Sequence, residues 1–167
     1  MPTANLSFRA ATVADIPMLL GWMQTPAVQQ WWGAPDDHQR VLEGDIANPA
    51  LDVQIVSGSQ PFALVQDYDA HHWPKPAYAA LPKGTRAMAA FIGVPTLLGQ
   101  GLGRTFLRAR AEAILAAGAP LVAIDPAAKN TRAIRAYRSA GFSGDAKIID
   151  EDGIAVIPMI FTKGDPK

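Results

Sequence analysis

The chain of 167 residues contains no cysteine, carries no net charge and has no hydrophobic run that approaches the length of a membrane span. Without cysteine, the chain cannot form disulfides, thiolate metal sites or a cysteine nucleophile. A formal net charge of zero gives no reason to expect a nucleic-acid surface or attraction to anionic membranes. Residues 1–10 lack the basic start and the long apolar middle of a signal peptide. We therefore expect a cytoplasmic enzyme or binding domain.

Hydrophobic residues make up 49% of the chain and charged residues 18%, the balance of a globular protein with a well-supplied core. A chain of this length is expected to form one domain, residues 1–167. The elements predicted from apolar periodicity and from helix-capping residues are a strand at 6–10, helices at 13–24 and 36–46, strands at 51–56, 62–68 and 87–94, a helix from the glycine loop to Gly118, a strand at 120–125, a helix at 131–140 and strands at 146–149 and 154–161. This order predicts an α/β fold with a mixed sheet.

Three glycines, Gly99, Gly101 and Gly103, alternate immediately before a helical pattern. Glycines so spaced let backbone N–H groups converge on an anion, and the positive end of the following helix points to the same place. We interpret the stretch as a pyrophosphate-binding loop, with a flexible loop before an ordinary core helix as the alternative. The loop follows the fourth strand, and Arg104-Thr105 lacks the spacing of a phosphate-loop nucleotidase, so neither of the common nucleotide-binding motifs is indicated.

Two adjacent tryptophans, Trp31 and Trp32, are expected in a loop between the first two helices, where they either line a ligand cleft or pack beneath the loop. A second loop, 69–84, is rich in proline and contains His71 and His72. No third ligand at a familiar spacing accompanies these histidines, so we predict no metal site.

Two blocks carry a family resemblance: FIGVPTLLGQGLGRTFL at 91–107 and IDPAAKNTRAIRAYRSAGF at 124–142. Together they resemble the GCN5-related N-acetyltransferase (GNAT) superfamily, and more narrowly the branch of aminoglycoside 6′-N-acetyltransferases and siderophore-biosynthesis acetyltransferases. Residues 8–33 resemble the N-terminus of that branch, and the order of elements agrees over essentially the whole chain. The resemblance implies the acyl-CoA N-acyltransferase fold, a central mixed sheet flanked by helices, with acetyl-CoA as co-substrate.

The same resemblance implies a set of coenzyme contacts. Backbone groups of the glycine loop would bind the pyrophosphate, although Leu98 stands where many members carry Gln or Arg. The apolar strand before the loop would pair with the pantetheine arm, and Asn130 matches the position that hydrogen-bonds this arm. The implied contacts are Phe91, Ile92, Gly93, Val94, Leu98, Gly99, Gln100, Gly101, Leu102, Gly103, Arg104, Asn130, Ala133 and Tyr137.

Tyr137 matches the general acid that protonates the departing CoA thiolate in the superfamily. A thiolate whose conjugate acid has a pKa of ~8.5 accepts a proton from a nearby phenol with a pKa of ~10 as it leaves. The alternative is a tyrosine that only packs in the core.

The acceptor site departs from the aminoglycoside branch. A free amine with a pKa near ~10 is mostly ammonium at neutral pH, so its attack on a thioester needs a base. In that branch an Asp lies in the central strand after a Gly-x-Arg; here residues 84–86 are Gly-Thr-Arg, but Ala89 occupies the Asp position. The loop 69–84 holds two lysines where aminoglycoside enzymes tend to be acidic, and polycations need carboxylates to replace their hydration.

Asp125 and Asp152 do match acidic positions of the branch. Asp125 is the last residue of the predicted strand 120–125, at the C-terminal end where α/β sites collect, although an Asp before a proline can also serve only the turn. Tyr137 and Asp125 are the catalytic candidates, and the base is unassigned. The predicted acceptor contacts are Trp31, Trp32, Tyr68, Ala89, Asp125 and Asp152.

The sequence therefore predicts an acetyl-CoA-dependent N-acetyltransferase for a primary amine of a small molecule. The alternatives are a siderophore-precursor acetyltransferase and a catalytically weak acyl-CoA-binding or sensing domain. A monomer and a homodimer are both compatible with the sequence.

Overall fold

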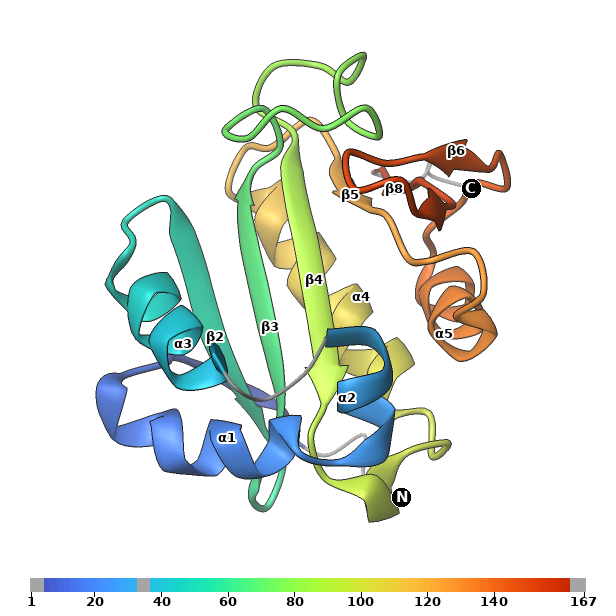
Figure 1. Ribbon diagram of the computed structural model, residues 1–167. Coiled ribbons are helices and arrows are strands. Elements are labelled where there is room, and N and C mark those ends of the chain that lie inside the picture. The colour runs from blue at the N-terminus through green and yellow to red at the C-terminus, as the bar shows by residue number, and fades with distance from the viewer. Residues whose placement is uncertain (1–4, 33–36, 163–167) are drawn as a thin grey trace. The chain divides into compact units, whose positions relative to one another are not determined.

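The computed structural model describes residues 5–32 and 37–162, and the elements follow the predicted order apart from two differences (Figure 1). The chain divides into two compact units, one of Met1–Asp67 with Ala89–Leu102 and one of Tyr68–Met88 with Gly103–Lys167. Strands β3 (Pro61–Asp69) and β4 (Arg86–Ile92) run through both units. The predicted helix start at residue 36 lies outside the described residues.

The first unit holds strands in the order β1-β2-β3-β4. β1 (Ser7–Ala10) pairs antiparallel with β2 (Leu51–Ser57). A short 3-10 helix (Val13–Asp15), α1 (Ile16–Met23), α2 (Pro26–Trp32) and α3 (His38–Ala47) connect these two strands. α3 packs against both α1 and β2. The core of this unit consists of Ile16, Leu19, Trp22, Met23, Val28, Leu42, Val53, Ile55, Leu64 and Phe91.

Helix α2 corrects the prediction of a loop around the two tryptophans. Pro26 opens this helix, in a position where its missing N–H is not needed and its fixed φ suits the helix. The Thr25 hydroxyl donates to the Trp22 carbonyl at 2.7 Å, and the Gln29 N–H donates to the Thr25 carbonyl at 2.9 Å. Proline therefore starts a second helix here as well as ending the first one.

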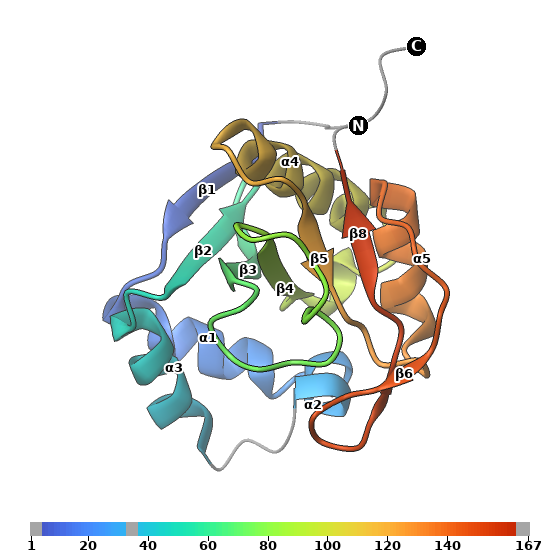
Figure 2. The same cartoon turned by 90° about the horizontal axis from the view of Figure 1, so that it is seen from above.

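The second unit holds strands in the order β4-β5-β8 (Figure 2). β5 (Val122–Ile124) is parallel to β4 and antiparallel to β8 (Met159–Phe161). Helices α4 (Leu102–Ala116) and α5 (Thr131–Ala140) complete the unit together with a small antiparallel pair, β6 (Ile148–Ile149) and β7 (Ala155–Val156). Parallel and antiparallel pairs in one strand order confirm the predicted mixed sheet flanked by helices.

The predicted last strand, 154–161, is two strands that pair with different partners. β7 pairs with β6, whereas β8 pairs with β5. Pro158 lies between them, and because proline has no N–H it cannot continue a ladder. At the end of β7 the Ile157 N–H donates to the Pro126 carbonyl at 2.9 Å, so this segment ties itself to the loop that follows β5.

Within residues 5–32 and 37–162, none of the helices has both the length and the apolar character that a membrane crossing requires.

Candidate active site

The glycine loop has the backbone geometry expected of an anion-binding turn. Gly99 and Gly101 have φ values of 75° and 79°, in the left-handed region that side chains disfavour. The Gln100 side-chain amide donates to the Thr96 carbonyl at 2.7 Å and holds the loop to the turn before it. α4 begins at Leu102, directly after these two glycines, and the N-terminal end of a helix favours a negative charge. The loop therefore fits the predicted pyrophosphate site, which stays a prediction.

The end of β4 is packed by tryptophans of the first unit. The Phe91 ring meets the Trp32 ring edge-on at 5.0 Å and the Trp22 ring at 6.4 Å between centroids. Trp31 is 37% exposed, so only its neighbour packs against the strand. The Gly93 N–H donates to the Phe62 carbonyl at 2.8 Å and continues the pairing of β4 past Ile92.

The Gly93→Ala substitution is expected to lower the free energy of unfolding by about 1–3 kcal/mol, the usual effect of overpacking a core. An added Cβ would lie 2.1 Å from Cγ of Trp22, so the indole must move. Thermal unfolding measures this change. Gly21→Ala in α1 is the matched control, because nothing lies within 4 Å of its added methyl group. An unchanged melting temperature for Gly93→Ala would contradict the close packing.

In the second unit, the charge of Asp125 acts on all three tyrosines of the chain, Tyr68, Tyr78 and Tyr137, and we call these four residues the tyrosine–aspartate cluster. The Tyr78 hydroxyl, from the loop between β3 and β4, donates to Oδ1 of Asp125 at 2.7 Å. Asp125 directly follows β5 and is half-buried. The Tyr137 side chain, on α5, is 8% exposed and packs against Phe142 at 5.9 Å between ring centroids.

Burial sets the protonation of this cluster. It raises the pKa of the Asp125 carboxyl, while the hydrogen bond from Tyr78 and the charge of Lys75 act in the opposite direction. Burial also raises the pKa of Tyr137, and the negative charge of Asp125 raises it further. Burial raises the pKa of Tyr68 too, against the charge of Lys75. The three tyrosines are therefore protonated at physiological pH, and the Tyr78 hydroxyl donates to the Asp125 carboxylate.

Asn130 caps helix α5 as predicted. Its side-chain oxygen accepts the Ala133 N–H at 3.2 Å, and the helix ends at Gly141, which has a φ of 114°. The cap uses the oxygen of the amide, and within the described residues no hydrogen bond uses its N–H2 group. A carbonyl oxygen of the pantetheine arm could accept a hydrogen bond from this N–H2 group.

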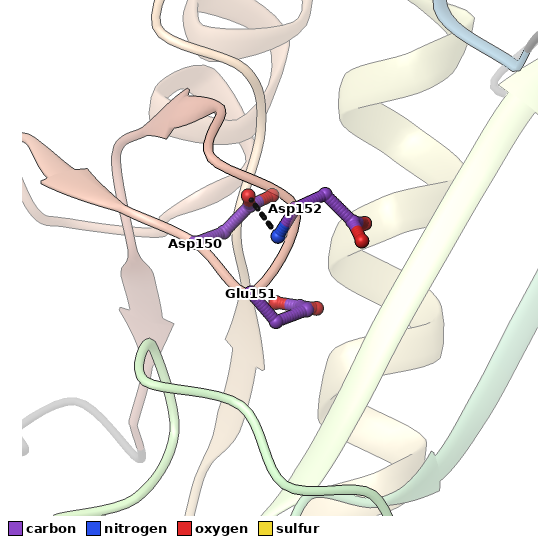
Figure 3. Close-up of side chains that lie close together, drawn as sticks. All are labelled: Asp150, Glu151 and Asp152. Carbon is purple, nitrogen blue, oxygen red and sulfur yellow. Dashed lines mark hydrogen bonds between the residues drawn. The ribbon is translucent and has the colours of Figure 1, made fainter.

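The acidic turn between β6 and β7 is shown in Figure 3. The Asp150 carboxylate accepts the N–H groups of Asp152 and Ile154 at 2.9 and 2.8 Å, which is a turn-forming role. Glu151 pairs with Lys75, with 3.5 Å between Oε2 and Nζ. Asp152, a predicted acceptor contact, is exposed. Because two of the three carboxylates have protein partners, we assign no metal to this turn.

The structure brings together some of the predicted site residues and adds others. Tyr68, Asp125 and Tyr137 share one cluster in the second unit, and Trp32 and Phe91 are in contact in the first. Ala89 lies half-buried in β4. Tyr78 and Lys75 were missed: Tyr78 is 47 residues from Asp125, and no spacing pattern in a proline-rich loop indicates the contact.

The two histidines of that loop have structural partners. The backbone N–H of His71 donates to the Asp69 carboxylate at 2.8 Å, and its ring Nε2 lies 3.1 Å from the Tyr78 carbonyl oxygen. The His72 ring meets Trp73 edge-on at 4.4 Å. These contacts help to shape the segment that carries Tyr78.

Comparison with known proteins places this arrangement in a family. Residues 11–149 match the family model of the acetyltransferase (GNAT) domain. Aminoglycoside N(6′)-acetyltransferase type 1 of Klebsiella pneumoniae is 26% identical over 166 residues, covering 91% of this chain and 81% of that protein. A structure of AAC(6′)-Ib in complex with paromomycin and acetyl-CoA is also 26% identical, with a TM-score of 0.83 over 95% of this chain and 94% of that one. An uncharacterized protein of Bacillus halodurans, 21% identical over 94% of this chain and 83% of that one, shares the fold with a TM-score of 0.84.

The predicted family and fold are thereby confirmed. The family model spans most of the chain, and the agreement with AAC(6′)-Ib extends over nearly all of it. The chain belongs to the GNAT acetyltransferase family and is an N-acetyltransferase.

Proposed function

We propose that this protein, with residues 1–167 acting as one domain, transfers the acetyl group of acetyl-CoA to a primary amine of a small molecule other than a typical aminoglycoside. Acetyl-CoA is the co-substrate, as in the similar solved enzymes that hold acetyl-CoA or coenzyme A. The observation that carries the proposal is the half-buried Asp125 carboxylate of the second unit, which accepts a hydrogen bond from the Tyr78 hydroxyl and whose charge acts on Tyr137.

Asp125 suits the handling of an amine. A half-buried carboxylate attracts an ammonium ion and accepts a proton from it, directly or through water. The freed amine attacks the thioester carbonyl carbon, a C–N bond forms, and the C–S bond breaks. The amine nitrogen loses its second proton to water in the same process, the thiolate takes one proton from an acid, and that acid regains a proton from solvent. Tyr137 is the acid that we propose.

Burial changes the pKa argument made for Tyr137 from sequence alone. Because its pKa is raised, Tyr137 is a weaker acid than an ordinary phenol and stays protonated. Transfer to the sulfur then requires that the departing thiolate is also desolvated, since burial raises the pKa of a thiol in the same way. Proton donation is thus coupled to exclusion of water at the leaving group.

The proposed preference for acceptors other than aminoglycosides rests on a carboxylate that is missing from the first unit. Ala89 carries no charge where the aminoglycoside branch has Asp, and β4 buries the position partly. The similar solved enzymes hold paromomycin, ribostamycin or kanamycin, all of them aminoglycosides. A polycation loses hydration on binding and needs carboxylates in return, so this chain is expected to favour acceptors of lower charge.

Ala89 also favours a second candidate, an acyl-CoA-binding or sensing domain with little turnover. Such a domain would keep the glycine loop and Asn130 but lack a working base. Asp125 is the group that decides between the two candidates, because it supplies a carboxylate that Ala89 does not.

Two measurements on one preparation test the proposed function. Thermal-shift titration with acetyl-CoA reports binding, and release of free CoA thiol across a panel of amines, kanamycin included, reports turnover. We expect stabilisation by acetyl-CoA and thiol release with small primary amines. Binding without release on any amine would favour the sensing domain, and no stabilisation by acetyl-CoA would contradict both candidates.

A further inference from the structure

A lysine side chain lies within the tyrosine–aspartate cluster. Nζ of Lys75 is 3.5 Å from Oε2 of Glu151 and 5.9 Å from the centroid of the Tyr78 ring. The Lys75 side chain is 25% exposed and that of Glu151 31% exposed, so the ion pair is partly shielded from water. The charge of the same ammonium group also acts on Tyr68 and opposes the rise that burial causes in the pKa of that phenol.

This ammonium group also acts on Asp125. Burial favours the neutral form of Lys75, but the negative charges of Asp125 and Glu151 and the contact with Tyr68 outweigh it, and the pKa of Lys75 is raised overall. Lys75 is therefore charged at any pH at which the enzyme works. The positive charge of Lys75 lowers the pKa of Asp125, whereas the negative charges of Glu151 and Asp150 raise it.

We propose that Lys75 is a specificity-determining residue that restricts the acceptor to amines with a single positive charge. The inference rests on the proposed function and names the substrate class of the same cluster. Asp125 is the carboxylate that pairs with the reacting ammonium ion of the acceptor. A second ammonium group on the acceptor would enter a region in which Glu151 is already paired and Lys75 repels it. Repulsion between like charges in a partly buried site weakens binding of the acceptor with two ammonium groups, and the enzyme therefore selects the acceptor with one.

A purely structural role for Lys75 makes a different prediction. The Lys75–Glu151 pair also joins the loop 69–84 to the acidic turn, so its loss could simply loosen both segments. In that case all amines would lose turnover in proportion and the ratio between them would stay constant. Repulsion instead changes the ratio, and its effect declines as salt screens the charges.

The experiment compares two acceptors of equal length, cadaverine with two ammonium groups and aminopentanol with one. We expect wild type to favour aminopentanol, and the ratio of kcat/KM for cadaverine over aminopentanol to rise about tenfold or more in both Lys75→Met and Lys75→Gln. In wild type, the preference for aminopentanol should weaken as the salt concentration rises.

Lys83→Met is the matched control, since Lys83 belongs to the same loop, is exposed and, within the part of the chain that the structure describes, has neither the ion pair nor the ring contact of Lys75. Its ratio should equal that of wild type. Equal ratios in wild type and both Lys75 variants, with thiol release intact, would overturn the role of Lys75 and leave the proposed function standing. No thiol release from wild type with any amine would overturn the proposed function and this inference together.

Discussion

The Tyr137→Phe substitution is expected to lower kcat by about 10²–10⁴-fold, the range that a positioned general acid contributes. The phenol is buried against Phe142, and both its burial and the charge of Asp125 raise its pKa. It therefore keeps its proton across the working pH range, and the fall in kcat should be the same at pH 6 and pH 9 within about twofold. Steady-state kinetics with acetyl-CoA and a responsive amine measure this effect.

The controls for Tyr137→Phe are stability and coenzyme affinity. Within the described residues the Tyr137 hydroxyl makes no hydrogen bond, so its removal leaves no buried partner unpaired, and the melting temperature should not fall. The dissociation constant for acetyl-CoA should change by less than about threefold, because the proposed role of the hydroxyl is to protonate the leaving sulfur after binding. A variant with wild-type kcat would remove Tyr137 from the mechanism.

The Asp125→Asn substitution is expected to lower kcat/KM for the amine by about 10²-fold or more, since it removes the carboxylate that we propose attracts the ammonium ion and accepts its proton. In wild type, burial raises the pKa of Asp125, so the active carboxylate takes up a proton at a higher pH than an exposed Asp does. The acid limb of the pH profile should therefore lie above the ordinary range for Asp, and it should be absent from Asp125→Asn.

The Tyr78→Phe variant tests the same assignment without removing the carboxylate. The hydrogen bond from Tyr78 lowers the pKa of Asp125, so its loss should shift the acid limb to higher pH. Since the native pKa of Asp125 is raised, the folded state binds this proton more tightly than the unfolded chain, and ionisation of Asp125 costs stability at neutral pH. Asp125→Asn should therefore not be electrostatically destabilising. An acid limb that is identical in all three proteins would exclude Asp125 as the titrating group.

Local signals in the sequence predicted the parts of the site that depend on backbone conformation. Gly99 and Gly101 have positive φ values, which suit the glycine loop that their spacing predicted, and Asn130 caps α5 as its position before the helix indicated. These features depend on a few consecutive residues, so rules of backbone propensity and helix capping are sufficient to predict them. The family resemblance added the expected fold, which the comparisons confirmed.

The parts that were wrong or missed depend on contacts between distant residues or on one residue with two possible roles. Pro26 is compatible with the end of one helix and with the start of another, and the structure uses both. Pro158 separates strands that pair with different partners, which an unbroken apolar pattern does not indicate. Tyr78 and Lys75 join the Asp125 cluster from a loop without regular structure, so no periodicity could place them.

The most direct test of the account is a competition experiment in which the enzyme, acetyl-CoA and a mixture of monocationic amines and kanamycin react together. Mass spectrometry identifies the acetylated products, and a thiol assay counts the CoA released. We predict N-acetylated monocationic amines as the main products, with one CoA thiol released per acetyl group transferred. Acetylated kanamycin as the main product, or CoA release without any acetylated amine, would contradict the account.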